Sequence, residues 1–495
     1  MYLHELLTEI TADSLLNRQV SGFALDNRLL QPGMGFVALQ GTQQHGLAYA
    51  EAAVAAGAVV ILYEPVADII VPECQVPVIA ITNLAEKLGG LAAEFYAHPS
   101  RSMSMIGVTG TDGKTSVTHF IAEAMQSLGK QSAVMGTIGI GRPGALQTAT
   151  HTTPDAISVH AHLKELMAVN IDMVAMEVSS HALDQGRVNA VNFDIAVLTN
   201  LTRDHLDYHH TEAAYAEAKR KLFHWDGLRA AVLNLDDAFG RSLADELNSS
   251  DVQVLGYGVG DVTAYPANTL VATHANFDHN GICAQISSPW GEGELKAAVL
   301  GRFNLDNLLA TLGVLLLQDY DLEAALVAIS TVQTVPGRME RVTIANQQKE
   351  LLTVVDYAHT AAALHSVLSA VRAHTRRELI CVFGCGGDRD AGKRPLMAQA
   401  AEQGADQVIV TDDNPRNENP AAIFADIRQG FMQPTGIYFE HDRSQAIHEA
   451  ICRAEAGDTV LIAGKGHETV QIVQQENRPF DDREQARKAL QECAA

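Results

Sequence analysis

The stretch MSMIGVTGTDGKTSVTHFIAEAMQSLG, residues 103–129, decides how this chain is expected to fold. It begins with an apolar run, passes through the glycine-containing turn 110–113, and continues from Lys114 as an amphipathic segment. A strand, a glycine turn with Lys-Thr and a helix together point backbone N–H groups and a helix dipole at a phosphate. The usual P-loop would have glycine at position 108, which is valine here, so we expect a phosphate loop of a different type.

Two side chains of this turn suit a nucleoside triphosphate. Lys114 would neutralise β- and γ-phosphate oxygens, and the Thr115 hydroxyl would face Mg²⁺. A tight βα turn that happens to contain Lys-Thr is the structural alternative. Magnesium takes oxygen ligands, and one carboxylate together with Thr115 and ATP oxygens is a typical set. The nucleotide interpretation therefore also needs a carboxylate elsewhere in the chain.

Acidic and histidine side chains follow two further apolar runs. Glu177 ends the run IDMVAME, and His205 comes shortly after FDIAVLTNL. In open parallel sheets the carboxyl ends of the strands line the ligand crevice, so these groups can lie near the phosphate loop. For His209 and His210, taken alone, we favour a solvated polar turn.

The rest of the chain alternates short apolar runs with amphipathic stretches, which is typical of βα units on a largely parallel sheet. A length of 495 residues predicts about three domains. We expect an α/β protein with a smaller N-terminal α/β domain at 1–98, a central P-loop-like domain with a mainly parallel sheet at 99–337, and a C-terminal Rossmann-like domain at 338–495. Residues 251–300 are more β-like and dotted with glycine.

The composition excludes several classes of protein. The net charge of −24 opposes binding to a phosphate backbone, so no nucleic-acid partner is expected. No apolar run approaches the roughly 20 residues that cross a bilayer. The acidic N-terminus also lacks the features of a secretion signal, so we expect no membrane association and a cytoplasmic location. Reduced, structural thiols fit that location and are expected for Cys74, Cys283, Cys381, Cys385, Cys452 and Cys493.

The motif GVTGTDGKT, residues 107–115, resembles the ATP loop of the Mur ligases, whose relatives include the folylpolyglutamate synthetases. The resemblance continues over essentially the whole chain and implies that the central domain is an ATPase with ATP as co-substrate. Asp112 stands where the family usually has asparagine, and Ala361 and Ala362 follow DYAHT where Pro-Asp is usual. The resemblance implies ATP-binding residues at Gly110, Thr111, Asp112, Gly113, Lys114, Thr115, Ser116, Asn304, Arg338 and Asp356.

Lys219 lies in TEAAYAEAKRKLF, residues 211–223, where the periodicity alone indicates a solvated helix face. In Mur ligases the lysine at the matching position is carbamoylated by CO₂, and this N6-carboxylysine can hold a second Mg²⁺. The modification needs a neutral amine and therefore a lowered pKa. The resemblance implies catalytic roles for Lys114, Glu177, His205 and Lys219. It implies metal ligands at Thr115, Glu177, His205 and the carbamate of Lys219.

By the same resemblance, FALDNRLLQPGMGFVALQGTQQHG, residues 23–46, matches the region that holds uridine, so the N-terminal domain is expected to bind UDP. Asn27 stands where serine is common. Polar segments of the central block match positions that bind the muramoyl dipeptide, although each would otherwise be an ordinary polar loop. The residues implied for the UDP-N-acetylmuramoyl dipeptide are Leu25, Asn27, Thr42, Gln43, Gln44, Thr152, Thr153, Ser179, Gln185 and Arg187.

The motif DNPR, residues 413–416, follows the apolar run QVIVT and is the family's mark of members that add diaminopimelate. meso-Diaminopimelate differs from lysine by one extra carboxylate with its own amine, and a planar arginine can bind that carboxylate through two hydrogen bonds. A generic turn is the structural alternative. The C-terminal domain is therefore expected to bind the amino acid through Arg389, Asp413, Asn414, Pro415, Arg416, Gly464 and Glu468.

The resemblance as a whole implies an ATP-dependent ligase that makes a peptidoglycan precursor from small-molecule substrates. It would add meso-2,6-diaminopimelate to the D-glutamate side-chain carboxylate of UDP-N-acetylmuramoyl-L-alanyl-D-glutamate through an acyl phosphate. A sibling ligase that adds another amino acid, such as L-lysine, is the alternative among enzymes. A nucleotide-dependent switch or binding module is the alternative from another class, and it would leave DNPR, GKGHE and Lys219 without a role.

Overall fold

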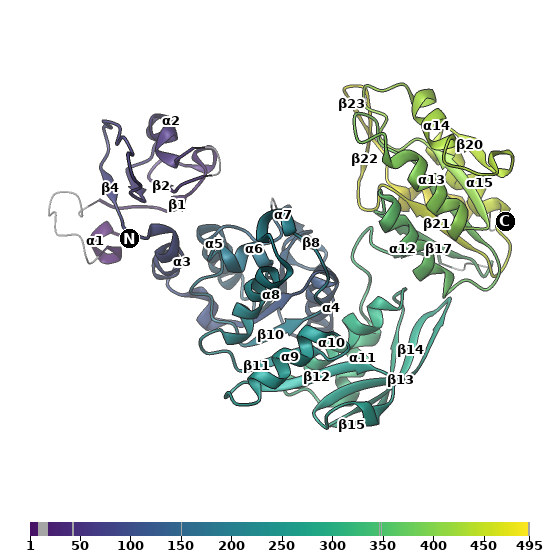
Figure 1. Cartoon of the computed structure of the whole chain (residues 1–495), viewed down its shortest axis with the longest axis horizontal. Coiled ribbons are helices and arrows are strands. Elements are labelled where there is room, and N and C mark those ends of the chain that lie inside the picture. The colour runs from purple at the N-terminus through teal and green to yellow at the C-terminus, as the bar shows by residue number, and fades with distance from the viewer. Residues whose placement is uncertain (8–17, 42–43, 150, 346, 348, 494–495) are drawn as a thin grey trace. The chain divides into compact units, whose positions relative to one another are not determined.

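The structure is a computed structural model that describes residues 1–7, 18–41, 44–149, 151–345, 347 and 349–493. The chain divides into two compact units, Met1–Gly256 and Tyr257–Ala495. Both units are built from βα units on mainly parallel sheets, so the expected α/β class is confirmed (Figure 1). The boundary between the units falls inside the block 99–337, within β12 (Gln253–Val259).

The N-terminal part of the first unit is a small parallel sheet in the order β1-β2-β3-β4. Strands β1 to β3 are buried throughout, as apolar parallel strands that are covered on both faces should be. Val37 and Leu62 of this sheet share a core with Leu84 and Leu88 of α3 and with Ile157 of α5. The bounds are α1 (Leu3–Leu6), β1 (Phe23–Ala24), β2 (Gly35–Ala38), α2 (Ala50–Ala55), β3 (Val60–Tyr63), β4 (Val78–Ala80) and α3 (Leu84–Phe95).

The larger sheet of the first unit contains the order β11-β10-β5-β9-β6-β7-β8. Strand β5 lies between β10 and β9, and all three run parallel. Because Val108 pairs with Glu177 and Thr109 pairs with Leu198, the carboxyl ends of these strands meet at one edge. The strands are β5 (Ser104–Thr109), β6 (Ser132–Gly136), β7 (Gly139–Arg142), β8 (Ala145–Gln147), β9 (Met173–Glu177), β10 (Ile195–Leu198) and β11 (Ala230–Asn234). The helices are α4 (Lys114–Ser127), α5 (Ala156–Ala168), α6 (Ser180–Asp184), α7 (Leu206–His209), α8 (Glu212–Arg220) and α9 (Ala238–Leu247).

The second unit begins with an antiparallel ribbon in the region 251–300, where the sequence is β-like and rich in glycine. A helix that is buried on nearly all sides, α10, follows this ribbon, as its almost uniformly apolar sequence predicts. The bounds are β13 (Thr269–Asp278), β14 (Gly281–Ser288), β15 (Gly291–Ala297), α10 (Phe303–Leu317) and α11 (Leu322–Ser330).

The remainder of the second unit contains a six-stranded sheet in the order β16-β17-β21-β18-β19-β20 and a separate antiparallel pair, β22-β23. Alternate strand residues face opposite sides: Val354 and Phe383 pack with α12, α13 and α14, whereas Val355 and Val382 pack with α15 and α16. Strand β16 is antiparallel to β17 and the other neighbours pair in parallel, so the Rossmann-like expectation is confirmed. The strands are β16 (Glu340–Val342), β17 (Leu352–Asp356), β18 (Leu379–Phe383), β19 (Gln407–Thr411), β20 (Tyr438–Glu440), β21 (Thr459–Ala463), β22 (Val470–Val473) and β23 (Glu476–Pro479). The helices are α12 (Ala361–Arg372), α13 (Lys393–Gly404), α14 (Pro420–Arg428), α15 (Arg443–Arg453) and α16 (Asp482–Glu492).

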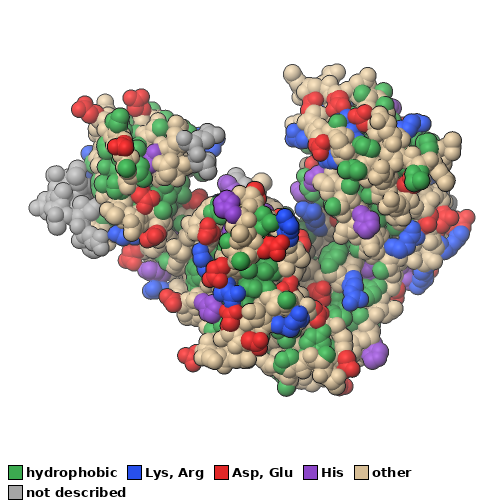
Figure 2. Space-filling model, viewed as in Figure 1, with side chains coloured by type: hydrophobic (Ala, Val, Ile, Leu, Met, Phe, Trp, Pro, Cys, Tyr) green, Lys and Arg blue, Asp and Glu red, His purple; other side chains and the backbone are tan. Residues whose placement is uncertain are grey.

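On the face shown in Figure 2, acidic and basic side chains are interspersed rather than gathered into a continuous basic stripe. Among the described residues, no helix combines the length and apolar character that a bilayer crossing requires.

The expectation that all six cysteines are reduced is wrong for two of them. Helices α15 and α16 pack against the same core and bring the Cα atoms of Cys452 and Cys493 to 5.2 Å, and the two sulfurs form a disulfide. These residues are 41 positions apart, so their spacing in the sequence did not indicate the pairing. The free cysteines are Cys74, Cys283, Cys381 and Cys385.

Candidate active site

The turn after β5 is held through its backbone. Gly110 and Gly113 adopt φ values of 151° and 84°, and a β-carbon on Gly110 would collide with Thr199. The Asp112 backbone N–H donates to Asn200 Oδ1 at 2.9 Å, and the Thr199 hydroxyl donates to the Asp112 carbonyl at 2.6 Å. These bonds do not involve the Asp112 side chain, so aspartate in place of asparagine leaves them intact.

Lys114 and Thr115 open α4 directly after this turn, and Ser116 follows in its first helical turn. The Lys114 ammonium donates to the carbonyls of Gly110 and Thr111, at 2.9 Å each. Burial lowers the pKa of Lys114, while the nearby Glu177 carboxylate opposes that shift. The lysine is thus held over the turn by carbonyl oxygens, with a carboxylate close by.

Glu177 ends β9 and faces the start of α4. Its Oε2 accepts from the Thr115 hydroxyl at 2.9 Å, and its Oε1 accepts from the Thr137 backbone N–H at 2.7 Å. The carboxyl group is 1% exposed, and burial raises its pKa, while these two bonds and the Lys114 charge act in the opposite direction. The oxygen donors of Thr115 and Glu177 are of the type that Mg²⁺ prefers, so this part of the site fits a magnesium ion.

Lys219 is buried, and the solvated helix face that its periodicity indicated is wrong for this residue. Its side chain is 1% exposed, and its Nζ donates to the Gly110 carbonyl at 2.7 Å and lies 4.5 Å from the centre of the Tyr215 ring. Burial, followed by the positive charge of Lys114, lowers the pKa of Lys219 to about 6. The amine is therefore mostly neutral at pH 7.

His205 lies at the start of α7 with a left-handed backbone, φ 52°. Its Nε2 is 3.5 Å from Asp204 Oδ2, and its ring packs against those of His181 and Tyr215. Tyr215 in turn shares a hydrogen bond of 3.1 Å with the Thr111 hydroxyl, which links this ring cluster to the phosphate loop.

His209 belongs to the same cluster, and the solvated turn expected for it is wrong. It is buried because α7 packs on α6, where its Nε2 lies 3.0 Å from the Ser180 hydroxyl. His181 is the other histidine of the cluster. Burial, followed by the charges of His205 and His209, lowers the pKa of His181.

The residues implied for the muramoyl dipeptide form one connected patch in the first unit. The Thr153 hydroxyl donates to the Glu177 carbonyl at 2.8 Å and accepts from the Ser179 backbone N–H at 3.1 Å. Arg187 donates to the Thr153 carbonyl at 3.0 Å and to Gln185 Oε1 at 2.8 Å. Thr152 is linked to this patch through Thr137, whose hydroxyl lies 3.1 Å from that of Thr152 and also bonds the Glu177 carboxylate. The patch is therefore continuous with the Glu177 carboxylate.

Three of the residues implied for uridine, Leu25, Asn27 and Gln44, lie in the segments that connect the strands β1, β2 and β3. Leu25 is partly buried against its core, and Asn27 begins a short 3-10 helix that Asp26 caps. Gln44 is exposed, and its carbonyl accepts from the Gly41 backbone N–H at 3.1 Å. Thr42 and Gln43 lie outside the described residues.

In the second unit, the DNPR residues Asp413, Asn414, Pro415 and Arg416 follow β19. Arg416 has a left-handed backbone, φ 51°, which β22 stabilises: the Arg416 N–H donates to the Ile472 carbonyl at 3.0 Å. Its guanidinium Nη1 donates to the Gly387 carbonyl at 2.8 Å. A β-carbon on Gly387 would collide with the Pro415 carbonyl, so this close approach requires glycine.

A buried lysine that the sequence interpretation did not select supports this loop. Lys465 is fully buried, and its Nζ donates to Asn414 Oδ1 at 2.9 Å and to Glu468 Oε2 at 3.0 Å. Asn414 also donates to the same Glu468 oxygen at 2.9 Å, which closes the triad. Lys465 lies between Gly464 and Glu468 in the motif GKGHE, so its position in that motif could have identified it as a residue of this site.

Two buried arginines were also missed, because their partners are distant in sequence. Arg443 makes a two-pronged ion pair with Asp482, with both contacts at 2.7 Å and both side chains fully buried. Arg394 bonds Glu418 at 2.6 Å. Glu418 in turn accepts from the Asp388 backbone N–H at 3.1 Å, beside the exposed Arg389. These pairs hold the loops around DNPR.

The three remaining ATP positions lie in two places. Asp356 ends β17 and accepts backbone N–H bonds from Met339 and Ala358, and burial raises its pKa. The guanidinium carbon of Arg338 lies 5.1 Å from the centre of the Tyr357 ring, and Tyr357 directly follows Asp356 in the chain. Asn304 instead uses its amide at the start of α10, where it donates to the Leu300 carbonyl at 2.7 Å.

The departure at Ala361 and Ala362 falls at the start of α12. These residues begin α12, whose start is capped by Thr360, the hydroxyl of which accepts from the Ala363 backbone N–H at 3.3 Å. The helix therefore forms without the usual proline.

Comparison with known proteins agrees with this arrangement. The chain matches the Mur ligase family catalytic domain at residues 19–96, the Mur ligase middle domain at 108–315 and the Mur ligase glutamate ligase domain at 337–466. The chain belongs to the Mur ligase family.

Close relatives share nearly the full length of the chain. It is 47% identical over 490 residues to the UDP-N-acetylmuramoyl-L-alanyl-D-glutamate--2,6-diaminopimelate ligase of Ectopseudomonas mendocina, covering 99% of this chain and 98% of the relative. It is 48% identical to the ligase of the same name from Pseudomonas aeruginosa, with the same coverage. A solved structure of a ligase of that name is 36% identical and superposes with a TM-score of 0.76, covering 99% of both chains. The chain is thus similar to these ligases from end to end.

Proposed function

We propose that this chain is an ATP-dependent ligase that joins meso-2,6-diaminopimelate to the D-glutamate side-chain carboxylate of UDP-N-acetylmuramoyl-L-alanyl-D-glutamate. The observation that carries the proposal is the 47% identity, over 490 residues, to a ligase of that name. We assign the uridine end to residues 1–98, ATP to 99–337 and the amino acid to 338–495. Because ATP and a UDP-linked sugar are its substrates, the chain would work in the cytoplasm on a peptidoglycan precursor.

The residues of the first unit suit activation of a carboxylate. A carboxylate and an amine do not condense in water, so the γ-phosphoryl group of ATP would first pass to the D-glutamate side chain. Lys114, over the glycine turn, would bind the transferred group and offset its charge. The amine would then attack the acyl phosphate, and the tetrahedral intermediate would expel phosphate. The chemistry requires no side-chain nucleophile.

Oxygen donors in the same place support a magnesium site. Thr115 and Glu177 would hold one ion, with His205 nearby, and bound Mg²⁺ would offset the negative charge of the phosphates. Two solved structures with the same fold are described as holding ADP, a folylpolyglutamate synthase and a MurF ligase from Thermotoga maritima. These two proteins are 18% and 16% identical to this chain. At that level the likeness shows a shared fold, and the bound ADP belongs to those two proteins.

Lys219 would act as the N6-carboxylysine. Its neutral amine would attack CO₂, form a nitrogen–carbon bond and release one proton to solvent, which leaves a carbamate anion. The low pKa of Lys219 supports this step, because the protonated amine has no lone pair. The modification would replace a cation next to Gly110 with an anion that could hold a second magnesium ion.

In the second unit we assign the extra carboxylate of diaminopimelate to Arg416. A guanidinium binds a carboxylate through two hydrogen bonds, whereas the lysine side chain ends in an amine that offers no such acceptor. Asp413, Asn414, Pro415, Gly464 and Glu468 would shape the surrounding site together with Arg389.

The first test of the function is ADP release from ATP and Mg²⁺ with UDP-N-acetylmuramoyl-L-Ala-D-Glu, measured separately with meso-diaminopimelate and with L-lysine. Mass spectrometry identifies the product. We expect turnover with diaminopimelate alone. Turnover with lysine alone would retain the ligase and overturn the specificity, and ADP release without an amide product would favour a nucleotide switch.

Substitution of Arg416 tests the specificity assignment. We expect Arg416→Ala to lower kcat/KM for diaminopimelate by a factor of 100 or more, since losing a buried charged contact costs several kcal/mol. The affinity for ATP should not change. Arg478→Ala, an exposed arginine of the β22–β23 hairpin, is the matched control. An unchanged kcat/KM in Arg416→Ala would contradict the assignment.

A further inference from the structure

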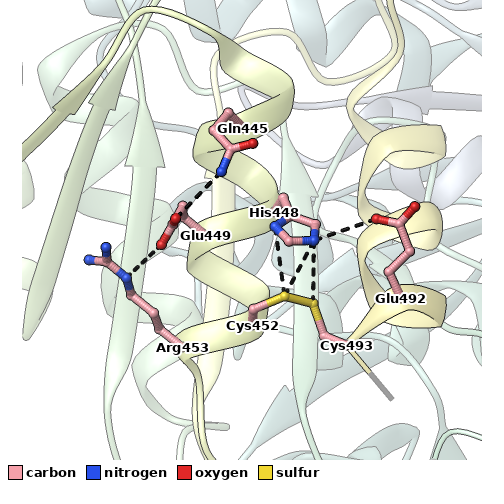
Figure 3. The surroundings of a disulfide bond; sticks show 7 residues. All are labelled: Gln445, His448, Glu449, Cys452, Arg453, Glu492 and Cys493. Atoms are coloured by element: carbon pink, nitrogen blue, oxygen red, sulfur yellow. Dashed lines mark hydrogen bonds and ion pairs between the residues drawn. A yellow bond between two sulfur atoms is a disulfide. The ribbon is translucent and has the colours of Figure 1, made fainter. Parts of the chain in front are cut away.

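A cluster of sulfur, nitrogen and oxygen donors lies between α15 and α16, and the proposed ligase reaction gives it no role (Figure 3). His448 and Cys452 are four residues apart on one face of α15, and Cys493 directly follows α16. The His448 Nε2 is 3.5 Å from Cys452 Sγ and 3.9 Å from Cys493 Sγ. The Glu492 Oε2 lies 3.5 Å from the same nitrogen. The ligand atoms of His448, Cys452 and Cys493 all lie within 4.8 Å of one another, and Glu492 approaches the histidine.

The types of these donors indicate which ligand they suit. Two thiolates and an imidazole are three of the four ligands that Zn²⁺ and similar cations take in four-coordinate sites. We propose that, once the disulfide is reduced, Cys452, Cys493 and His448 bind one thiophilic divalent cation of the zinc class, and that Glu492 or a water molecule fills the fourth position.

The distances fit this geometry. With metal–sulfur bonds of about 2.3 Å and metal–nitrogen bonds of about 2.0–2.1 Å, a tetrahedral edge between ligand atoms measures roughly 3.5–3.8 Å. The separations of His448 Nε2 from the two sulfurs, 3.5 and 3.9 Å, already lie near this range. The sulfurs must move apart from their bond, and side-chain rotation can provide this because their Cα atoms are 5.2 Å apart.

The surroundings allow a cation to enter. The His448 side chain is 38% exposed and that of Glu492 is 50% exposed. A cavity of about 180 Å³ opens beside them, which Lys488 also lines. Arg453 bonds Glu449 at 2.7 Å on another side of α15, so this cation does not compete with the metal for the cluster (Figure 3).

Binding would depend on the redox state. A phosphine or thiol reductant supplies two electrons, and with two protons from solvent the S–S bond becomes two thiols. The cation then displaces both thiol protons to solvent as it binds the thiolates. The disulfide form offers no thiolate, so oxidation would release the metal.

The test uses the full-length protein, reduced with a phosphine and titrated with Co²⁺ as a spectroscopic probe of the zinc class. We expect one equivalent to give the strong thiolate-to-cobalt absorption and the visible bands of a tetrahedral site, and Zn²⁺ to abolish both. Cobalt in the proposed magnesium site would have no thiolate ligand and no such absorption. Oxidised protein should give none. Absence of the thiolate absorption in the reduced protein would overturn the proposal.

Variants locate the site. We expect the double variant Cys452→Ser, Cys493→Ser to lose the thiolate absorption entirely and His448→Ala to bind at least tenfold more weakly. Cys283→Ser removes a partly exposed free thiol elsewhere in the second unit and should bind as the wild type does. Zn²⁺ should raise the Tm of the reduced wild type but not of the double variant. An unchanged absorption in the double variant would also refute the site.

Discussion

The basic side chains of the phosphate-loop cluster in the first unit and of the DNPR region in the second are held by different kinds of partner. Lys114 and Lys219 donate to backbone carbonyls of the glycine turn. Burial lowers the pKa of both, and the charge of Lys114 lowers that of Lys219 further. In the second unit, by contrast, Lys465 and Arg443 each bond a carboxylate, that of Glu468 and that of Asp482. Arg416 is the exception there, because its guanidinium donates to carbonyl oxygens.

The difference separates two tasks. A basic group held by carbonyls is not neutralised by a carboxylate. Lys114 and Arg416 can therefore offer their charge to an incoming anion, the transferred phosphoryl group and the carboxylate of the amino acid. Lys219 can react as a neutral amine. A cation already neutralised by a buried carboxylate fixes the positions of neighbouring loops. We therefore expect Lys114, Lys219 and Arg416 to act on substrates, and Lys465 and Arg443 to act on the structure around them.

The largest expected effect follows from breaking the Arg443–Asp482 pair. Arg443→Met leaves the Asp482 carboxylate buried without its partner, which should lower the free energy of unfolding by about 3–5 kcal/mol. Thermal unfolding measures the loss. The double variant Arg443→Met, Asp482→Leu should regain most of it, because both charges are then removed. Full stability in the single variant would contradict a structural role.

Lys114→Met tests whether a lysine held by carbonyls acts on the substrate rather than on the stability of the fold. We expect kcat to fall by about 10²–10³, because one preorganised charge contact to the transferred group is lost. The Tm should change little, since the lysine bonds only to carbonyls of its own turn. Lys221→Met, an exposed lysine paired with Asp184, is the control. A large loss of Tm with an unchanged kcat would assign Lys114 to the fold instead.

The pH dependence of stability tests the buried amine of Lys219. Its pKa is about 6 in the folded chain and 10.5 as the ordinary value, so between these pH values the unfolded state binds one more proton. Stability contributed by this group therefore rises with pH, by up to about 1.4 kcal/mol per pH unit, or about 2.7 kcal/mol from pH 6.5 to 8.5. Lys219→Met should lack this component when both proteins are unfolded in CO₂-free buffer. The same pH dependence in both proteins would refute a lowered pKa.

The smallest expected effect concerns the hairpin that braces the DNPR loop. Gln471 donates to the Asp413 carbonyl at 2.8 Å, and a single hydrogen bond of this kind contributes about 1 kcal/mol. Gln471→Ala should therefore raise KM for diaminopimelate about fivefold and leave kcat and the KM for ATP unchanged. Glu476→Gln, at the exposed end of the hairpin, serves as control. An equal rise in KM for ATP would indicate a general loss of structure.

Several features could be predicted because they depend on residues that are close together in the sequence. The strand, turn and helix at 103–129 required only an apolar run, glycines and an amphipathic period, and β5, the glycine turn and α4 lie there. The position of Glu177 beside Thr115 followed from a general property of parallel sheets, whose carboxyl ends meet. The motifs that resemble the Mur ligases carried the choice of site residues.

Other features depend on contacts between distant segments, and only the tertiary structure decided them. Lys219 and His209 have the sequence surroundings of exposed residues, yet α8 and α7 pack so that both side chains are buried. The Arg443–Asp482 pair and the Cys452–Cys493 disulfide join α15 to α16 or to the residue after it, across 39 and 41 positions. The sequence by itself determined the local elements and the chemical types at the site. Packing decided the burial and the charged partners, and with them which lysines have a lowered pKa and which are paired with a carboxylate. Desolvation and ion pairing act through space rather than along the chain.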